Sequence, residues 1–414
     1  MSGQTVTVNG MQFRFRDRPV AVICVDGGDP AYFADGFARG LLPNIRKLMA
    51  GGFHATAKSV LPSFTNPNNV SIATGCPPSV HGISGNYFIN ETTGEAVPMT
   101  DPKFLRADTI FSALSHAGIK VAAVTAKDKL RRLLGHNIKD GIFFSSEKAA
   151  SCSFGENGIE NVEAMVGMKQ PDVYSAELSI IVLKAGIELI KRNAASVLYL
   201  SLTDYIQHTY APGETGSDDF YRQLDGCVGE LLETGAIVGI TADHGMNDKA
   251  RADGSPNVIF IQDELDARFG AGVTRVILPI TDPYVAHHGS LGGYVRVYCS
   301  GSLAPADVIT FIMTLPGIDG AFDRETACRL FNLPADREGD VAVISDANTA
   351  IGSSRSYHNL AELAGHRLRS HGGVTEQTVP FMTSRPLSAD YRERAERLKI
   401  FNYNIFDFTI NGTV

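Results

Sequence analysis

Three acidic residues in this chain directly follow short apolar runs of the kind that forms a buried strand. They are Asp26 after residues 21–25, Asp204 after residues 197–203, and Asp243 after residues 236–242. Ligands of open α/β sheets bind outside the carboxyl ends of the strands, so these three carboxylates are expected to converge on one crevice. Crowded carboxylates repel one another unless a cation lies between them. The pattern therefore predicts a metal site.

Three histidines lie close to these acids or in a glycine-rich segment that could join them. His208 follows Asp204 by four residues, His244 is adjacent to Asp243, and His371 stands in Ser370-His-Gly-Gly373. A carboxylate at a strand end and an imidazole one helical turn later can point at the same ion. Each pair alone is more often a surface or capping pair, but all these segments together favour a metalloenzyme.

A threonine in the segment from Pro62 to Asn69 is a candidate nucleophile. Pro67 stands just inside an apolar segment and predicts the start of a helix, with Thr65 or Asn66 near its N-cap. The positive end of the helix dipole would favour an anion beside Thr65. A plain N-cap is the alternative interpretation of this threonine.

The elements that must position these residues alternate between strand-like and helix-like patterns. This alternation predicts an α/β core, made of residues 1–249 and 367–414, with a mostly parallel central sheet flanked by helices. The predicted strands cover residues 20–25, 56–61, 119–125, 197–203 and 236–242, and the predicted helices cover residues 43–50, 107–117, 130–134 and 174–191.

The pattern changes between residues 250 and 366. Short strands at 258–261, 273–279 and 294–298 and an amphipathic helix at 306–315 predict an α+β cap inserted into the core. The insertion separates His244 from His371, so it is expected to leave and rejoin the core close to the site. Its histidine pair, His287 and His288, could reach the site, although such pairs in loops are more often structural.

Length and composition limit the class of protein. A chain of 414 residues suggests one large domain with an insertion, or two domains. A net charge of -8 without a dense Lys/Arg run argues against nucleic-acid binding, and no apolar stretch approaches the roughly 20 residues that span a bilayer. Six scattered cysteines and the absence of a leader-like N-terminus predict a reducing cytoplasm. The oligomeric state cannot be read from the sequence, so a homodimer stays open.

The motifs resemble the alkaline phosphatase superfamily in its nucleotide pyrophosphatase/phosphodiesterase-like branch, and within that branch the phosphonoacetate hydrolases. The resemblance covers nearly the whole chain and implies an alkaline phosphatase-like core. It rests on Val25-Asp-Gly27, Pro62-Ser-Phe-Thr-Asn-Pro-Asn-Asn69, Thr74-Gly-Cys-Pro-Pro-Ser-Val-His-Gly-Ile83, Asn86, Thr125-Ala-Lys-Asp-Lys-Leu130, Thr203-Asp204 with His208, Thr241-Ala-Asp-His-Gly-Met246, and Ser370-His-Gly-Gly373.

The resemblance implies two zinc ions and a threonine nucleophile. One ion would be held by Asp204, His208 and His371, and the other by Asp26, Thr65, Asp243 and His244. The same ligands suit Mn²⁺ or Fe²⁺. The implied reaction cleaves the carbon–phosphorus bond of phosphonoacetate to acetate and phosphate through a phosphothreonine at Thr65. Asn86 would donate its amide to a phosphoryl oxygen, although an Asn in a glycine-rich loop is usually a turn residue.

Two lysines suggest the substrate class. Lys127 and Lys129 follow the strand-like run 121–125 and should stand at the same crevice. Side chains two residues apart diverge on a regular helix, so convergence requires an irregular turn before the helix. Two solvated lysines at a helix start are the alternative, and the helix dipole disfavours cations there. The resemblance implies that these lysines bind the carboxylate of the substrate.

Three other functions stay open. A phosphodiesterase or nucleotide pyrophosphatase would use the same metals and Thr65 but would not need the paired lysines. A metal-dependent phosphoglycerate mutase shares the core but uses serine, so Thr65 disfavours it. A binding module with a dead site would lack a ligand or the nucleophile, and none of the matched positions is missing.

Overall fold

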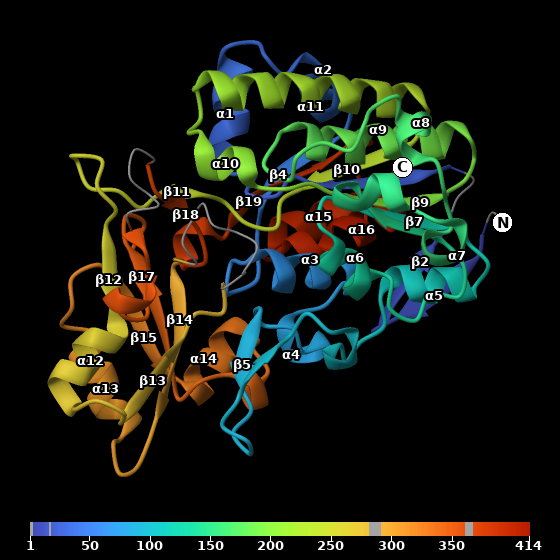
Figure 1. The fold of residues 1–414 in the computed structure, drawn as a ribbon. Helices are drawn as coiled ribbons and strands as arrows, with labels where there is room; N and C mark the ends of the chain where they lie inside the picture. The colour runs from blue at the N-terminus through green and yellow to red at the C-terminus, as the bar shows by residue number, and fades with distance from the viewer. Residues whose placement is uncertain (1–2, 16–17, 281–290, 361–366) are drawn as a thin grey trace.

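A seven-stranded sheet forms the centre of the molecule in a computed structural model that describes residues 3–15, 18–280, 291–360 and 367–414 (Figure 1). In spatial order its strands are β4 (Phe53–Lys58), β19 (Thr378–Thr383), β10 (Ile237–Thr241), β3 (Val20–Cys24), β9 (Val197–Ser201), β7 (Val121–Thr125) and β8 (Ile142–Ser145). The five strands from β10 to β8 are parallel, whereas β19 is antiparallel to both β10 and β4. The mostly parallel sheet predicted from the sequence is confirmed.

Helices cover both faces of this sheet, which explains the continuous apolar runs of its strands. All five residues of β3, β7, β9 and β10 are buried. One face packs against α1 (Pro30–Ala38), α2 (Pro43–Gly51), α9 (Glu177–Lys191) and α11 (Thr215–Glu233). The other face packs against α3 (Thr65–Thr74), α5 (Ile110–His116), α6 (Asp128–Leu134) and α16 (Ile405–Asp407) (Figure 1).

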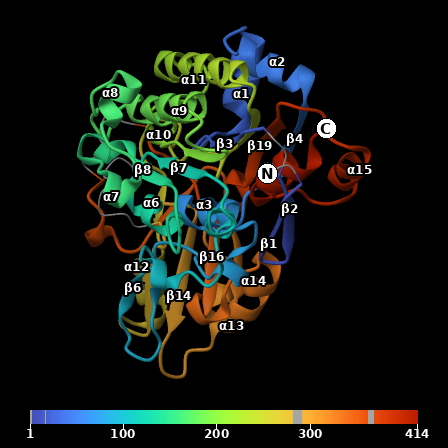
Figure 2. The same ribbon diagram turned by 90° about the vertical axis from the view of Figure 1, so that its right-hand side faces the viewer.

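A second lobe, here called the inserted lobe, lies between β11 (Asn247–Asp248) and β18 (Arg369–Ser370) in the chain and beside the core in space (Figures 1 and 2). Its four-stranded antiparallel sheet has the order β13 (Thr274–Ile277), β14 (Tyr294–Cys299), β16 (Val341–Ser345) and β15 (Ile318–Asp323). Helices α12 (Ile261–Phe269), α13 (Pro305–Ile312) and α14 (Arg324–Phe331) accompany it. Its apolar core includes Leu61 and Phe64 from the segment before α3. The domain boundaries at residues 250 and 366 stay a prediction.

The chain leaves for the inserted lobe and returns from it at adjacent points. β11 (Asn247–Asp248) pairs antiparallel with β18 (Arg369–Ser370), and the guanidinium of Arg369 donates to the carboxylate of Asp248. This pairing places His371 beside the segment that follows β10.

The remaining α-helices and strands are shorter or lie at the edges. They are β1 (Thr5–Val8), β2 (Met11–Arg14), β5 (Tyr87–Ile89), β6 (Ala96–Pro98), β12 (Val258–Phe260), β17 (Ala350–Gly352), α4 (Pro78–His81), α7 (Phe154–Asn157), α8 (Val162–Val166), α10 (Tyr205–Thr209) and α15 (Ala389–Arg397). None of the described helices is long and apolar enough to cross a membrane.

Candidate active site

The three strand-end carboxylates lie at one edge of the sheet. Asp26 follows β3 by two residues, Asp243 follows β10 by two, and Asp204 caps α10 just after β9. These three strands are parallel neighbours, so their carboxyl ends meet at the same edge. All three acids are buried. The structure thus brings together residues that lie more than two hundred positions apart in the sequence.

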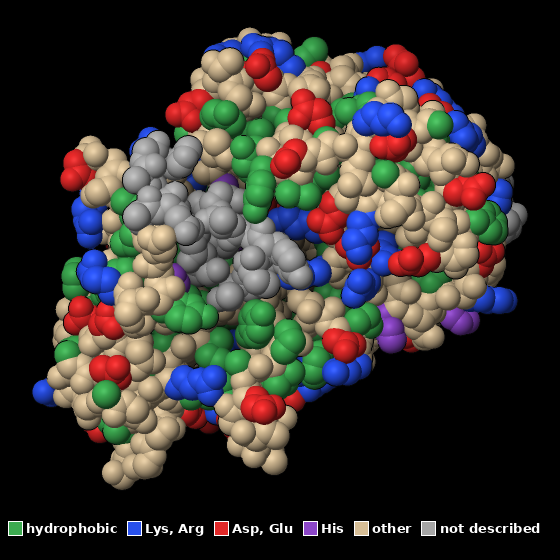
Figure 3. Space-filling model, in the orientation of Figure 1, with side chains coloured by type: hydrophobic (Ala, Val, Ile, Leu, Met, Phe, Trp, Pro, Cys, Tyr) green, Lys and Arg blue, Asp and Glu red, His purple; other side chains and the backbone are tan. Residues whose placement is uncertain are grey.

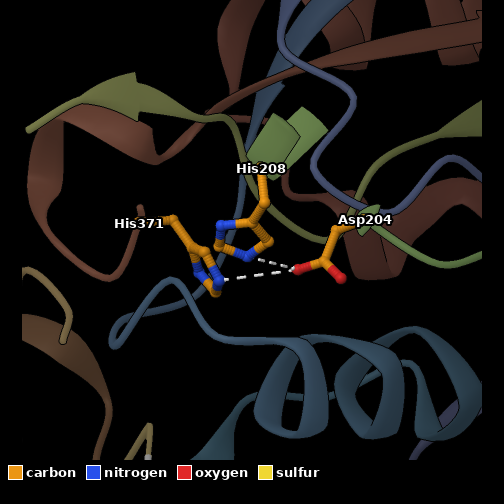
Figure 4. Close-up of side chains that lie close together, drawn as sticks. All are labelled: Asp204, His208 and His371. Atoms are coloured by element: carbon orange, nitrogen blue, oxygen red, sulfur yellow. Dashed lines mark ion pairs between the residues drawn. The ribbon is translucent and has the colours of Figure 1, made fainter. Parts of the chain in front are cut away.

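The first candidate ligand group consists of Asp204, His208 and His371 (Figure 4). Nε2 of His208 lies 2.9 Å from Oδ2 of Asp204, and Nε2 of His371 lies 3.8 Å from the same oxygen. Asp204 and His208 come from the start and the end of α10, whereas His371 comes from the segment after β18. One ligand atom from each residue lies within 4.8 Å of the others, which is close enough for a shared ion.

The second candidate group consists of Asp26, Asp243 and His244, with Thr65 beside it. Nε2 of His244 lies 3.3 Å from Oδ1 of Asp26, 3.6 Å from Oδ2 of Asp243 and 3.3 Å from Oγ1 of Thr65. The ring of His244 stacks on the ring of His371 with centroids 3.5 Å apart, so the two groups are contiguous. The structure therefore places every predicted metal ligand in one of two adjacent clusters.

The histidines are oriented as metal ligands are. Nδ1 of each ring donates to a backbone carbonyl: His208 to Arg369 at 2.7 Å, His371 to Ser63 at 2.7 Å, and His244 to Gly245 at 2.9 Å. These bonds select the tautomer that leaves a lone pair on Nε2, directed at the acids. Buried Oδ1 of Asp26, which has no hydrogen-bond partner in the described part of the chain, faces one of these lone pairs. Two such atoms repel unless a cation or proton lies between them, so the residues fit a metal.

The negative charge of the three buried carboxylates also favours the binding of a cation. Burial and the neighbouring charges of Asp204 and Asp243 raise the pKa of Asp26 well above its usual value. Burial, with the charge of Asp204, raises the pKa of Asp243 to about 7. Burial would also raise the pKa of Asp204, but His208 and Lys127 hold it well below the usual range. The surrounding protein therefore disfavours ionisation of all three carboxylates at once, and divalent cations would supply the missing positive charge.

Thr65 is the first residue of α3 and does not cap it. The N-cap position is taken by Phe64, one residue earlier than predicted, and its side chain cannot accept a hydrogen bond. The hydroxyl of Thr65 instead faces His244 at 3.3 Å. The capping interpretation of this threonine is therefore wrong.

A pocket beside Thr65 contains both predicted lysines. It is lined by Asp26, Phe64, Thr65, Asn66, Asn86, Lys127, Lys129, Leu130, Leu202, Asp204, Ile280 and His371. Nζ of Lys127 lies 3.8 Å from Oδ1 of Asp204. Lys127 is the N-cap of α6 and has an extended backbone, whereas Lys129 lies inside that helix. The change of backbone conformation between them is the irregular turn that their convergence required. On the face over α6, Lys and Arg side chains gather with Asp and Glu side chains beside them (Figure 3).

Asn86 also lines this pocket, in a loop that reaches both lobes. Its Oδ1 accepts from Nδ2 of Asn66 at 2.5 Å, and its Nδ2 donates to the carbonyl of Ile280 at 3.2 Å. The sequence interpretation assigned Asn86 to the site but named Asn66 only as a possible helix N-cap, although Asn66 stands next to the predicted nucleophile.

Asn69 is the main residue that the sequence interpretation missed. It is buried in α3, and its Nδ2 donates to Oδ2 of Asp243 at 3.1 Å and to the carbonyl of Thr65 at 3.0 Å. Its Oδ1 accepts from Tyr199 and Ser201 on β9. The available signal was the pair Asn68 and Asn69, which directly precedes the apolar segment 70–74. His287 and His288 lie outside the described residues.

Comparison with known proteins agrees with this geometry. The family model of type I phosphodiesterase / nucleotide pyrophosphatase matches residues 20–281. Venom phosphodiesterase of Macrovipera lebetinus is 31% identical over 114 residues, which are 26% of this chain and 13% of the venom protein. The chain thus matches only about an eighth of the length of that curated relative.

Solved structures extend the similarity to the whole chain. Phosphonoacetate hydrolase of Sinorhizobium meliloti in complex with phosphonoformate is 45% identical, covers 100% of both chains and has a TM-score of 0.94. The same enzyme in complex with phosphonoacetate is 44% identical, also over 100% of both chains, with a TM-score of 0.93. Murine ectonucleotide pyrophosphatase / phosphodiesterase 5 is 16% identical, covers 96% of both chains with a TM-score of 0.62, and shares the fold. The chain therefore belongs to the type I phosphodiesterase / nucleotide pyrophosphatase family, in the group that includes the phosphonoacetate hydrolase of Sinorhizobium meliloti.

Proposed function

We propose that this chain hydrolyses the carbon–phosphorus bond of phosphonoacetate and releases acetate and phosphate. The observation that carries this proposal is the pocket in which Thr65, Asn86, Lys127 and Lys129 lie together beside the two ligand clusters. The full-length similarity to an enzyme solved with phosphonoacetate supports the same substrate. In such a pocket, the lysines could bind a carboxylate and bound metal ions could bind a dianionic phosphonyl group.

Two zinc ions are the proposed cofactors, with Mn²⁺ or Fe²⁺ as alternatives for the same ligands. One would be held by Asp204, His208 and His371, and the other by Asp26, Thr65, Asp243 and His244. When bound, the ions would offset the negative charge of the phosphonyl group and lower the pKa of a coordinated hydroxyl. We expect Asp243→Ala to lower the zinc content from about two ions to about one, measured by elemental analysis. Exposed Asp219→Ala, on α11, is the control and keeps both ions.

Thr65 is the proposed nucleophile. Its hydroxyl proton passes to solvent, and its oxygen forms a bond to phosphorus while the carbon–phosphorus bond breaks and the electron pair passes to the leaving carbon. The carboxylate held by Lys127 and Lys129 takes up this charge as an enolate-like species, and water then protonates the carbon. Asn86 orients a phosphoryl oxygen. Water hydrolyses the phosphothreonine, which releases phosphate and restores Thr65.

Phosphate release from three compounds tests the proposal. Zinc-loaded protein should release phosphate from phosphonoacetate but not from methylphosphonate, whose leaving carbon has no carboxylate to accept charge. A nitrophenyl phosphodiester serves as the third compound and reports the ester reaction. Equal rates on phosphonoacetate and methylphosphonate would refute the role given to the carboxylate.

The second candidate function is phosphodiester hydrolysis, which the family match favours. It needs Thr65 and the metals but no pair of lysines in the pocket. Lys127→Met separates the two reactions: it should lower turnover of phosphonoacetate about a hundredfold and leave turnover of the diester within about threefold. A large loss on both compounds would show that Lys127 acts on the phosphoryl group or on Asp204 instead.

A further inference from the structure

The directions of Lys127 and Lys129 depend on a single peptide unit. Residues two apart on an α-helix are rotated by about 200° around its axis and so point about 160° away from each other, and two lysines inside α6 could not line one pocket. Lys127 lies outside α6 with an extended backbone (φ -112°, ψ 137°), whereas Lys129 lies within the helix. The peptide that joins Lys127 to Asp128 is therefore the turn that allows both lysines to line the pocket.

Both sides of this peptide are held by neighbouring elements. Oγ1 of Thr125, at the end of β7, donates to the carbonyl of Lys127 at 2.8 Å. The carboxylate of Glu147, in the 3₁₀ segment Ser146–Ser151 after β8, accepts from the backbone N–H of Asp128. The turn is thus tied to strand β7 and to the segment that directly follows β8, so the central sheet supports it from two sides.

The side chain of Asp128 is directed away from the pocket and into a charged cluster. Oδ1 accepts from Nε of Arg131 at 2.7 Å and from Oγ of Ser145 at 3.4 Å. Oδ2 lies 3.1 Å from Nζ of Lys148 and 3.2 Å from Nε of Arg132. The carboxylate is only 8% exposed, and Asp128 is absent from the pocket lining. Asp128 thus lies between Lys127 and Lys129 in the sequence, but its carboxylate pairs with other cationic side chains and is directed away from the substrate pocket.

We propose that Asp128 and Glu147 are positioning residues that make the pocket selective for ligands with a carboxylate next to the phosphonyl group. This inference rests on the proposed function and concerns residues that touch neither the substrate nor the metal ligands. Without the Asp128 carboxylate, the first turn of α6 would lose four polar contacts, and only the backbone bonds to Thr125 and Glu147 would still hold the two lysines relative to each other.

The test compares binding of two anions to the zinc-loaded protein by calorimetry. Phosphonoformate carries a carboxylate next to phosphorus, whereas orthophosphate does not. We expect Asp128→Asn to weaken phosphonoformate binding about tenfold and orthophosphate binding less than about twofold. Asp219→Asn is the matched control, because Asp219 also pairs with an arginine three residues later but is exposed on α11. It should change neither binding constant.

A second variant keeps the test decisive if Asp128→Asn fails to fold. Glu147 is half-buried, and Glu147→Ala removes only the acceptor for the Asp128 N–H, so it should weaken phosphonoformate binding roughly threefold with orthophosphate unchanged. Equal effects on both anions, or none on either, overturn the inference while the proposed function stands. If the native protein neither prefers phosphonoformate nor hydrolyses phosphonoacetate, the proposed function fails and the inference falls with it.

Discussion

The hydroxyl of Thr65 lies at the start of helix α3 and faces the ring of His244. It stands at the first residue of α3, 3.3 Å from Nε2 of His244, and the backbone N–H groups of the first helical turn favour negative charge there. Thr65→Val keeps the shape of the side chain and removes the oxygen. We expect turnover of phosphonoacetate to fall at least about a thousandfold, measured as steady-state phosphate release.

The same helix offers the matched control for this substitution. Thr74 lies buried at the other end of α3, and its Oγ1 donates to the carbonyl of Val70 at 2.7 Å. Thr74→Val removes a hydroxyl of the same kind far from the pocket, so turnover should stay within about twofold of native. Residual activity in Thr65→Val equal to that of Thr74→Val would exclude Thr65 as the nucleophile.

His81 is a buried histidine with a structural role and a predicted pH signature. Its Nε2 donates to Oγ of Ser71 at 2.8 Å, and its Nδ1 accepts from the N–H of Ile83 at 3.1 Å. Burial, and then the positive charge of Arg337, lowers its pKa to about 3. The neutral ring therefore fixes the loop after α4.

Acid should weaken the fold through this residue. The unfolded-state pKa of a histidine is about 6.5, so below that pH the unfolded chain binds a proton that the folded chain excludes, and stability falls as pH drops towards about 3. Between about pH 6.5 and pH 5 the loss is about 2 kcal/mol. His81→Gln should flatten this part of the pH profile, measured by urea unfolding. Profiles of equal slope in the native protein and the variant would contradict the prediction.

At the scale of elements, β14 of the inserted lobe holds the loop that carries Asn86. Arg296 on β14 is completely buried and pairs with Glu338 at 2.8 Å. Its Nη1 donates to the carbonyl of Tyr87 at 2.6 Å and its Nη2 to the carbonyl of Ser84 at 2.7 Å. These contacts lie on either side of Asn86, so the inserted lobe helps to position a residue of the pocket.

Replacement of Arg296 should therefore act through Asn86. A lysine cannot reproduce the fork of the guanidinium, so Arg296→Lys should lower kcat/KM for phosphonoacetate about tenfold. In an Asn86→Ala background the same substitution should cost less than about twofold, because the residue it positions is gone. Arg275→Lys, on neighbouring β13 where Arg275 is exposed and donates to the carbonyl of Gly94, is the matched control. An equal loss in both backgrounds would show that Arg296 acts on stability alone.

Local patterns were sufficient for the core of the fold. Asp26, Asp204 and Asp243 could be placed because a continuous apolar run marks a parallel central strand, and the carboxyl ends of such strands meet. The strand β15 was missed because its residues show no clear alternation of buried and exposed positions. The neighbouring β16 was also missed, although all five of its residues are buried.

The supporting contacts of the site could not be predicted in the same way. Asn69 bonds to Asp243 across 174 residues, and only the packing of α3 over the end of the sheet brings them together. The convergence of Lys127 and Lys129 depended on one irregular turn, which the sequence interpretation named as a requirement and which propensity does not reveal. The roles of the site residues in catalysis stay predictions, which the experiments above test.

At the scale of the whole molecule, the two ligand clusters join distant parts of the chain. They draw on the ends of β3, β9 and β10 and on the segment where the chain returns from the inserted lobe. Bound ions would therefore crosslink the core to the returning segment and remove the repulsion among three buried carboxylates. Metal removal should consequently weaken the entire fold as well as stop turnover.

Thermal unfolding before and after chelation measures this contribution. An ion present at 100 to 1,000 times its Kd stabilises the folded state by about 3–4 kcal/mol, so loss of two ions should lower the Tm of a chain of this size by roughly 10 °C. Asp243→Ala retains the cluster of Asp204, His208 and His371. Chelation should therefore lower the Tm of this variant by about half as much as it lowers the Tm of the native protein. Stoichiometric zinc should restore the native Tm, whereas orthophosphate alone should not. If elemental analysis finds no metal and the Tm is still that of the native protein, the crosslinking role is refuted. Protons alone would then relieve the charge repulsion among Asp26, Asp204 and Asp243.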